Sequence, residues 1–140
     1  MEQNLHVTVR SYAENLDDFG LVESTESDTV TVPATISKGG SEITLTYEQK
    51  NDNGECKTTL VLSNSKITLT RSGAIESVME FIEGKTTKTL YTVPPFSFDA
   101  EIETKRIRGS LDEGGGTLEL RYLLTIGGAK KNMRLSLTVY

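Results

Sequence analysis

Residues 117–126 read TLELRYLLTI, and after Gly127-Gly128 the chain continues through residues 129–140 as AKKNMRLSLTVY. In the first run every second position is apolar: Leu118, Leu120, Tyr122, Leu124 and Ile126. A period of two residues places these side chains on one face of an extended strand. Two glycines between two such runs are typical of a tight hairpin turn. The end of the chain therefore predicts two antiparallel strands, 117–126 and 130–140.

The same period recurs along nearly the whole chain. It predicts further strands at 5–13, 28–38, 41–49, 56–63, 66–72, 77–83, 86–93 and 96–108. The connections are short, and no segment has a convincing helical period. We therefore expect an all-β fold: a single antiparallel up-and-down β-barrel of about eight to ten strands, formed by residues 1–140 as one domain. A sandwich of two sheets is the alternative.

Some stretches depart from this regular pattern. Residues 14–27 are acidic but contain apolar residues, so we expect a helical turn or a flap there rather than disorder. Gly39-Gly40 predicts a tight hairpin turn, and Pro94-Pro95 ends a strand. Within 96–108, Ile107 is out of phase with the apolar residues before it, which predicts a bulge or bend.

The composition has an acidic balance. The formal net charge is -5 and the pI is about 4.9, so we expect neither nucleic acid nor a membrane surface as a partner. Two small basic clusters, interpreted as solvated strand ends or hairpin tips, comprise Lys105, Arg106 and Arg108, and Lys130, Lys131 and Arg134. A single cysteine excludes an intrachain disulfide. Because neither a signal peptide nor a spanning apolar run is recognisable, we expect a cytoplasmic protein.

No catalytic or metal-binding constellation is recognisable. His6 lies on the outward phase of the first predicted strand, where we expect it to be solvated. Cys56 has no evident partner and is interpreted as a small buried hydrophobe or an ordinary thiol. Asp112-Glu113 lacks the alternating acids of a calcium loop and is interpreted as part of a hairpin loop. We therefore expect no enzymatic activity, no metal and no other cofactor.

Several short motifs together resemble a known family. The most specific are Arg71-Ser72-Gly73 and Leu111-Asp112-Glu113-Gly114-Gly115, accompanied by Met79-x-Phe81-x-x-Gly84, Leu90-Tyr91-Thr92 and Leu118-Glu119-Leu120-x-Tyr122. From about residue 27 onward, the chain resembles the YwiB-like family of small bacterial proteins of unknown function. The resemblance implies a calycin-type barrel, similar in shape to lipocalins and fatty-acid-binding proteins, and supplies no catalytic residues. The lipocalin Gly-x-Trp element is absent because the chain has no tryptophan.

One constellation suggests a ligand site. Arg71 shares the strand phase of the apolar residues before it, so its side chain is predicted to point inward, as are those of Tyr47 and Tyr122. A guanidinium with two phenol hydroxyls can hold a carboxylate or phosphate head group, with an apolar tail in the barrel. The alternative places Arg71 at the barrel rim, capping loop carbonyls or paired with a carboxylate such as Glu119.

Two functions are therefore open. The first is binding of a small apolar or amphipathic ligand inside the barrel. The second is a protein–protein interaction module with a solidly packed barrel, for a protein partner that the sequence does not identify. The interior volume distinguishes them, and the large side chains able to fill it are Phe81, Phe96, Phe98 and Tyr122.

Overall fold

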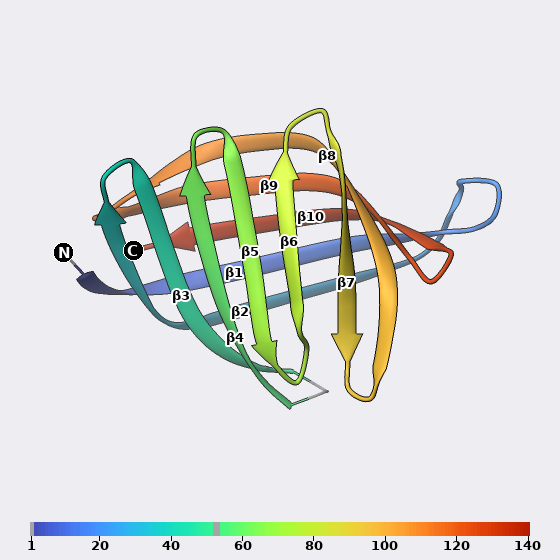
Figure 1. The fold of residues 1–140 in the computed structure, drawn as a ribbon, viewed down its shortest axis with the longest axis horizontal. Helices are drawn as coiled ribbons and strands as arrows, with labels where there is room; N and C mark the ends of the chain where they lie inside the picture. Colours follow the sequence, from blue (N-terminus) through green and yellow to red (C-terminus); the bar gives the residue numbers. More distant parts are fainter. Residues whose placement is uncertain (1, 52–53) are drawn as a thin grey trace.

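The structure, a computed structural model, describes residues 2–51 and 54–140. The described chain is built from ten strands joined by short turns (Figure 1). They are β1 (Glu2–Leu16), β2 (Val22–Gly39), β3 (Glu42–Asn51), β4 (Gly54–Ser63), β5 (Lys66–Gly73), β6 (Ser77–Ile82), β7 (Thr86–Val93), β8 (Phe96–Asp112), β9 (Gly115–Ile126) and β10 (Ala129–Val139). The all-β prediction is confirmed.

All ten strands belong to one antiparallel sheet, in the order β6-β5-β4-β3-β2-β1-β10-β9-β8-β7. Consecutive strands pair with each other, except β6 and β7, which are the two edges of the sheet. In addition, β1 pairs with β10 and so joins the two ends of the chain. The backbones of His6 and Tyr140 exchange two hydrogen bonds at that junction, with N···O distances of 2.7 and 2.9 Å. This is the up-and-down arrangement that the hairpin turns predict.

The two edge strands, β6 and β7, meet and nearly close the barrel. Glu76 and Thr92 exchange two backbone hydrogen bonds of 2.8 Å at one end of this seam. Further along, the hydroxyl of Thr87 donates to the carbonyl of Glu80 at 2.7 Å, and that of Thr89 donates to the carbonyl of Val78 at 2.6 Å. Threonine hydroxyls thus bond to backbone carbonyls that a sheet ladder would otherwise satisfy. The nearly closed barrel, rather than the sandwich, is the fold.

The core consists of the inward-pointing phase of each strand. Its largest side chains with less than 2% exposure are Ile36, Leu45, Leu60, Leu69, Phe81, Ile102, Leu120 and Leu137. Burial of each contributes roughly 1.5–3 kcal/mol to folding. The rings of Phe81 and Tyr122 meet edge to face with centroids 4.8 Å apart, so the two side chains fill part of the interior.

The acidic stretch 14–27 forms a β-hairpin, and the expected helical turn is wrong. β1 continues to Leu16 and β2 starts at Val22, so both strands are longer than the apolar phase indicates. The carboxylate of Asp17 accepts hydrogen bonds from the backbone N–H groups of Phe19 and Leu21, both at 2.9 Å, and this fixes the turn. The hairpin projects from the barrel like a flap (Figure 1).

The predicted irregularity in β8 is confirmed as a register shift between Thr104 and Arg106. The backbone N–H of Ile107, just past the shift, donates to the carboxylate of Glu83 at 2.9 Å. Of the four large side chains able to fill the barrel, Phe96 and Phe98 do not do so, because they are 65% and 41% exposed. They have the inward phase but lie at the end of β8, beyond the core.

The predicted turns lie close to their expected positions. Gly127 and Gly128 have φ angles of 56° and 83° and connect β9 to β10. Between β2 and β3 the turn residues are Gly40 and Ser41, one position later than expected, because Gly39 still pairs with Glu42. Pro94 and Pro95 occupy the turn between β7 and β8.

Candidate functional site

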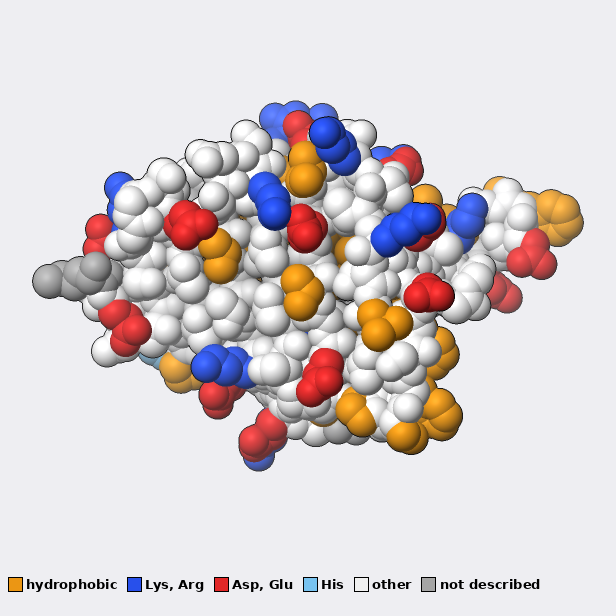
Figure 2. Space-filling view, in the orientation of Figure 1, with side chains coloured by type: hydrophobic (Ala, Val, Ile, Leu, Met, Phe, Trp, Pro, Cys, Tyr) orange, Lys and Arg blue, Asp and Glu red, His pale blue; other side chains and the backbone are white. Residues whose placement is uncertain are grey.

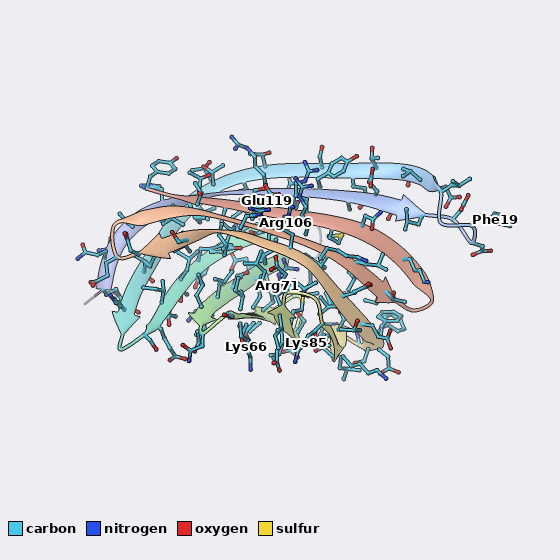
Figure 3. All side chains as sticks on the ribbon, turned by 90° about the horizontal axis from the view of Figure 1, so that it is seen from above. Phe19, Lys66, Arg71, Lys85, Arg106 and Glu119 are labelled. Atoms are coloured by element: carbon cyan, nitrogen blue, oxygen red, sulfur yellow. The ribbon has the colours of Figure 1, made fainter. Side chains whose placement is uncertain are left out.

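Arg71 lies near the end of β5, in line with the buried residues Ile67 and Leu69. Its side chain points into the space between the two sides of the barrel (Figure 3) and remains partly accessible to solvent. The alternative pairing with Glu119 does not occur, because that carboxylate bonds to Nε of Arg121 at 2.6 Å. Arg71 is therefore an inward arginine, as its strand phase predicts.

Tyr47 is brought to Arg71 by the sheet register. Tyr47 on β3 lies opposite Thr58 on β4, Thr58 lies opposite Arg71 on β5, and Arg71 lies opposite Ser77 on β6. The row thus crosses four neighbouring strands on their inner face. Tyr47 is only 3% exposed, and this burial raises the pKa of its phenol, while the Arg71 charge and a hydrogen bond with Thr58 act in the opposite direction.

Tyr122 approaches the same charge from β9. Its side chain is 6% exposed, and burial raises the pKa of the phenol while the nearby Arg71 charge lowers it. Its cross-strand neighbour on β8 is Thr104, which is also buried. The three predicted residues therefore come together. We use the term polar layer for the inward side chains of Tyr47, Thr58, Arg71, Ser77, Thr104 and Tyr122.

The polar layer contains hydrogen-bonding capacity that the described protein does not use. Within residues 2–51 and 54–140, the Arg71 guanidinium forms no hydrogen bond or ion pair. The buried hydroxyls of Ser77 and Thr104 also have no partner. Ser77 is the cross-strand neighbour of Arg71, and Thr104 is that of Tyr122. The unused groups therefore cluster around the predicted site and form a natural complement to an anion.

Thr58, Ser77 and Thr104 were not among the predicted site residues, although the sequence contains a signal for them. Each occupies an inward position on an otherwise apolar strand face: Thr58 precedes Leu60 by two residues, and Ser77 precedes Met79. Thr104 follows Ile102 in the same way. A polar residue on the buried phase of a strand indicates either an internal hydrogen bond or a binding site.

An opening lies beside the polar layer where β2 and β3 separate. β2 begins at Val22 but pairs with β3 only from Ala34 to Gly39, and Pro33, which has no N–H to donate, precedes the paired stretch. β3 turns away from β2 at this point (Figure 1). The resulting hollow, here called the portal, has a volume of about 530 Å³ and is lined mainly by Val32, Glu48, Gln49, Cys56, Lys57, Ser72 and Gly73.

On β3, β4 and β5, residues that line the portal are close in sequence to residues of the polar layer. Gln49, Cys56 and Gly73 line the portal and lie two residues from Tyr47, Thr58 and Arg71, respectively, on the same face of each strand. Two residues along each strand therefore separate the opening from the interior charge. The portal and the polar layer together are the candidate site.

The remaining chemistry-bearing residues lie outside the polar layer. Cys56 is 4% exposed, in agreement with its prediction as a small buried hydrophobe, although it also borders the portal. His6 is exposed, and its ring stacks near that of Tyr140 with centroids 6.2 Å apart. In the part of the chain that the structure describes, no three His, Cys, Asp or Glu side chains gather as metal ligands. The same part contains no helix long and apolar enough to cross a membrane.

The family model for DUF1934, a domain of unknown function, matches residues 20–137. The chain belongs to the DUF1934 family. A curated relative, the uncharacterized beta-barrel protein YwiB of Bacillus subtilis (strain 168), is 26% identical over 93 residues. That match spans 66% of each protein, just under two thirds of the relative's length. Neither description points to an enzymatic activity.

The crystal structure of the ywiB protein from Bacillus subtilis has the same fold as this DUF1934 protein. The superposition has a TM-score of 0.77 at 22% sequence identity and covers 96% of this chain and 92% of that one. The resemblance to the YwiB-like family is thus confirmed. The calycin and lipocalin comparison stays a prediction.

The structure explains two sequence motifs of this DUF1934 protein, one that ends at Gly73 and one that contains Asp112. Gly73 of the Arg71-Ser72-Gly73 motif has a φ of 115°, and its α-carbon lies against the Glu55 carbonyl, where a Cβ atom has no room. In the second motif, Asp112 Oδ1 accepts a hydrogen bond of 2.8 Å from the Gly114 N–H. The first motif therefore places Arg71 in the polar layer and ends its strand, and the second forms a turn.

Proposed function

We propose that this DUF1934 protein binds a small acidic amphiphile, with the anionic head group on Arg71 and the apolar tail in the portal. The observation that carries the proposal is the inward Arg71 guanidinium, without a partner among the described residues, beside the unpaired hydroxyls of Ser77 and Thr104. An arginine carries its positive charge at every physiological pH. The Arg71 side chain is only partly accessible to solvent, and an opposite charge with hydrogen bonds compensates the hydration that it has lost.

The chemistry of the polar layer fits a carboxylate or phosphate head group. The Arg71 guanidinium offers several N–H donors in a plane, which suits two oxygens of one anion. Because burial raises the phenol pKa of Tyr47 and Tyr122, both keep their protons at neutral pH and remain donors. An apolar head group would leave the Arg71 guanidinium without an opposite charge, so the layer favours an anion.

The tail is assigned to the portal and not to the barrel axis. Phe81 and Tyr122 already occupy part of the interior. The portal, in contrast, has about 530 Å³ of space and is bordered by the apolar side chains of Val32 and Cys56. A ligand entering there needs to advance only two residues along β3, β4 and β5 for its head group to reach the polar layer. Pockets of this size and mixed lining are typical of small-molecule sites.

A titration with 11-(dansylamino)undecanoic acid, a fluorescent fatty acid, tests the proposal. Wild-type protein should show saturable binding, and Arg71→Met, which keeps the side-chain length but removes the charge, should weaken it by about 1.5–3 kcal/mol. The methyl ester of the probe should bind wild-type and Arg71→Met equally. Arg108→Met is the matched control, because Arg108 is exposed and lies outside the polar layer.

Two results would contradict ligand binding at Arg71. One is the absence of saturable binding to wild-type protein. The other is unchanged probe affinity in Arg71→Met together with a lower melting temperature, which would assign Arg71 a purely structural role. In either case the protein–protein interaction module with a solidly packed barrel becomes the better account of the fold.

A further inference from the structure

A row of arginines crosses the outer face of the barrel on three neighbouring strands. Arg134 on β10 lies directly opposite Arg121 on β9, which lies directly opposite Arg106 on β8. The two basic clusters of the sequence therefore meet across β9, and the interpretation as solvated strand ends or hairpin tips is wrong for Arg106 and Arg134, which lie within β8 and β10. Like charges directly opposite each other on one sheet face are destabilising.

The bulge in β8 increases this charge. Thr104 is buried, yet both Lys105 and Arg106 are exposed, so the extra residue places two consecutive basic side chains outside the barrel. In Figure 3, Arg106 and Glu119 lie on the side of the barrel away from Lys66 and Lys85. We use the term arginine face for the exposed residues Arg10, Arg106, Arg108, Arg121 and Arg134.

The arginine face has little internal compensation. Arg121 pairs with Glu119, whose pKa is lowered by its hydrogen bond with Arg121 and by the charges of Arg121, Arg134 and Arg106. Among the described residues, Arg106 and Arg134 form no ion pair. A hollow of about 220 Å³ in this region is lined in part by Tyr12, Arg121, Met133 and Arg134, and also by Glu14. The face therefore offers positive charge together with a partly apolar depression.

The projecting hairpin has the opposite character. Residues 14–28, here called the acidic arm, contain no basic residue, and their acids are Glu14, Asp17, Asp18, Glu23, Glu26 and Asp28. None of these six carboxylates forms an ion pair within the described chain. The tip exposes Phe19 at 89%, Leu21 at 65% and Val22 at 51%. Hydrophobic side chains are visible at this projecting end in Figure 2, and Phe19 extends away from the barrel in Figure 3.

We propose that the acidic arm of one copy docks on the arginine face of a second copy, and that the contact is reciprocal. The outer phase of β1 carries Arg10, Tyr12 and Glu14 in succession, so arm and face adjoin on one surface. A two-fold axis that relates the two copies places the arm of each copy on the face of the other. The arm supplies six negative charges and an apolar tip, and the face supplies five positive charges around one carboxylate and a hollow.

A second copy is favoured over a nucleic acid as the occupant. The whole chain has a formal net charge of -5, which repels a polyanion at long range. The acidic arm, in contrast, is present on every copy at the same concentration as the face that it complements. Association between complementary charges is sensitive to salt.

Sedimentation velocity of the full chain at about 100 μM, in about 50 mM and about 500 mM NaCl, tests the proposal. Wild-type protein should dimerise in low salt and dissociate in high salt. The face-reversed variant Arg106→Glu/Arg134→Glu and the arm-reversed variant Asp18→Lys/Glu23→Lys should each dimerise roughly tenfold or more weakly. Lys38→Glu, an exposed charge at the far end of β2, should leave dimerisation unchanged.

A mixture of the two reversed variants separates lost charge complementarity from misfolding. Mixed in equal amounts they should dimerise again, because the new lysines of one variant then meet the new glutamates of the other, while the unchanged arm meets an unchanged face. A wild-type monomer in low salt would overturn the proposal, as would a dimer insensitive to both reversals. A monomer that binds single-stranded RNA through Arg106 and Arg134 would also overturn it and assign the face to nucleic acid.

Discussion

Arg71 occupies an inward position in β5. An aliphatic side chain at this position would lose less favourable hydration on folding than the charged guanidinium does. Its neighbours in the row, Thr58 and Ser77, are likewise polar on a strand face that is otherwise apolar. Buried polar groups in native proteins nearly always have hydrogen-bond partners. The hydroxyls of Ser77 and Thr104 have no partner among the described residues, and the proposed anion would supply one.

Gly115 is a residue whose backbone conformation and close backbone contact leave no room for a side chain. It has a φ of 110°, and a Cβ atom there would collide with the backbone carbonyl of Val139 on β10. We predict that Gly115→Ala lowers the free energy of unfolding by about 1–3 kcal/mol, the cost of a strained backbone conformation. Urea denaturation followed by circular dichroism measures this loss.

Gly84→Ala is the matched control for Gly115→Ala. Gly84 has a φ of 80°, but an added Cβ atom would meet no other atom within 4 Å. Its alanine variant isolates the backbone cost from the collision and should lose less stability. Equal losses in the two variants would contradict the role assigned to the contact between Gly115 and Val139.

Among the elements, the seam between β6 and β7 is the part of the barrel with the fewest backbone hydrogen bonds. The hydroxyls of Thr87 and Thr89 bond to the carbonyls of Glu80 and Val78, in place of a continuous ladder. We predict that Thr87→Val and Thr89→Val each lower stability by about 1 kcal/mol. Hydrogen exchange should accelerate in β6 and β7 before the other strands.

Thr31→Val serves as the control for the seam. The Thr31 hydroxyl bonds to that of Thr8 on the exposed outer surface, away from β6 and β7. Its replacement should leave the exchange of the seam strands unchanged. If the seam variants exchange uniformly faster over all ten strands, the barrel opens as one unit and the seam has no separate stability.

The strand phase was sufficient to predict the barrel and the inward orientation of Arg71, Tyr47 and Tyr122. It failed where local composition resembles another structure: Leu16, Phe19, Leu21 and Val22 have a spacing compatible with a helical turn, yet they lie at the tip of a hairpin. Phe96 shows a second limit, because phase gives the face of a strand but not whether the core extends to its end.

Contacts between strands were the least predictable part of the site. The pairing of Arg71 with Ser77, and of Tyr122 with Thr104, depends on register, which a single strand does not encode. The arginine row likewise depends on the bulge, since the register shift before Arg106 places it opposite Arg121. The sequence predicted the bulge, but not which side chains it would align.

At the scale of the whole molecule, sequential hairpins form a barrel in which the first strand, β1, pairs with the last, β10. The regions proposed for ligand binding and for self-association lie apart on this barrel. The polar layer lies inside, beside the gap between β2 and β3, whereas the acidic arm and the arginine face lie outside. The proposed ligand binding and the proposed self-association therefore involve different surfaces.

Native mass spectrometry of the protein purified from its own host tests the central claim most directly. We predict that wild-type protein retains an acidic amphiphile at one molecule per chain, and that Arg71→Met, purified in the same way, does not. Tandem fragmentation then identifies the anionic head group. A wild-type spectrum with the bare chain mass alone, or an identical adduct on Arg71→Met, would contradict the anion site in the polar layer.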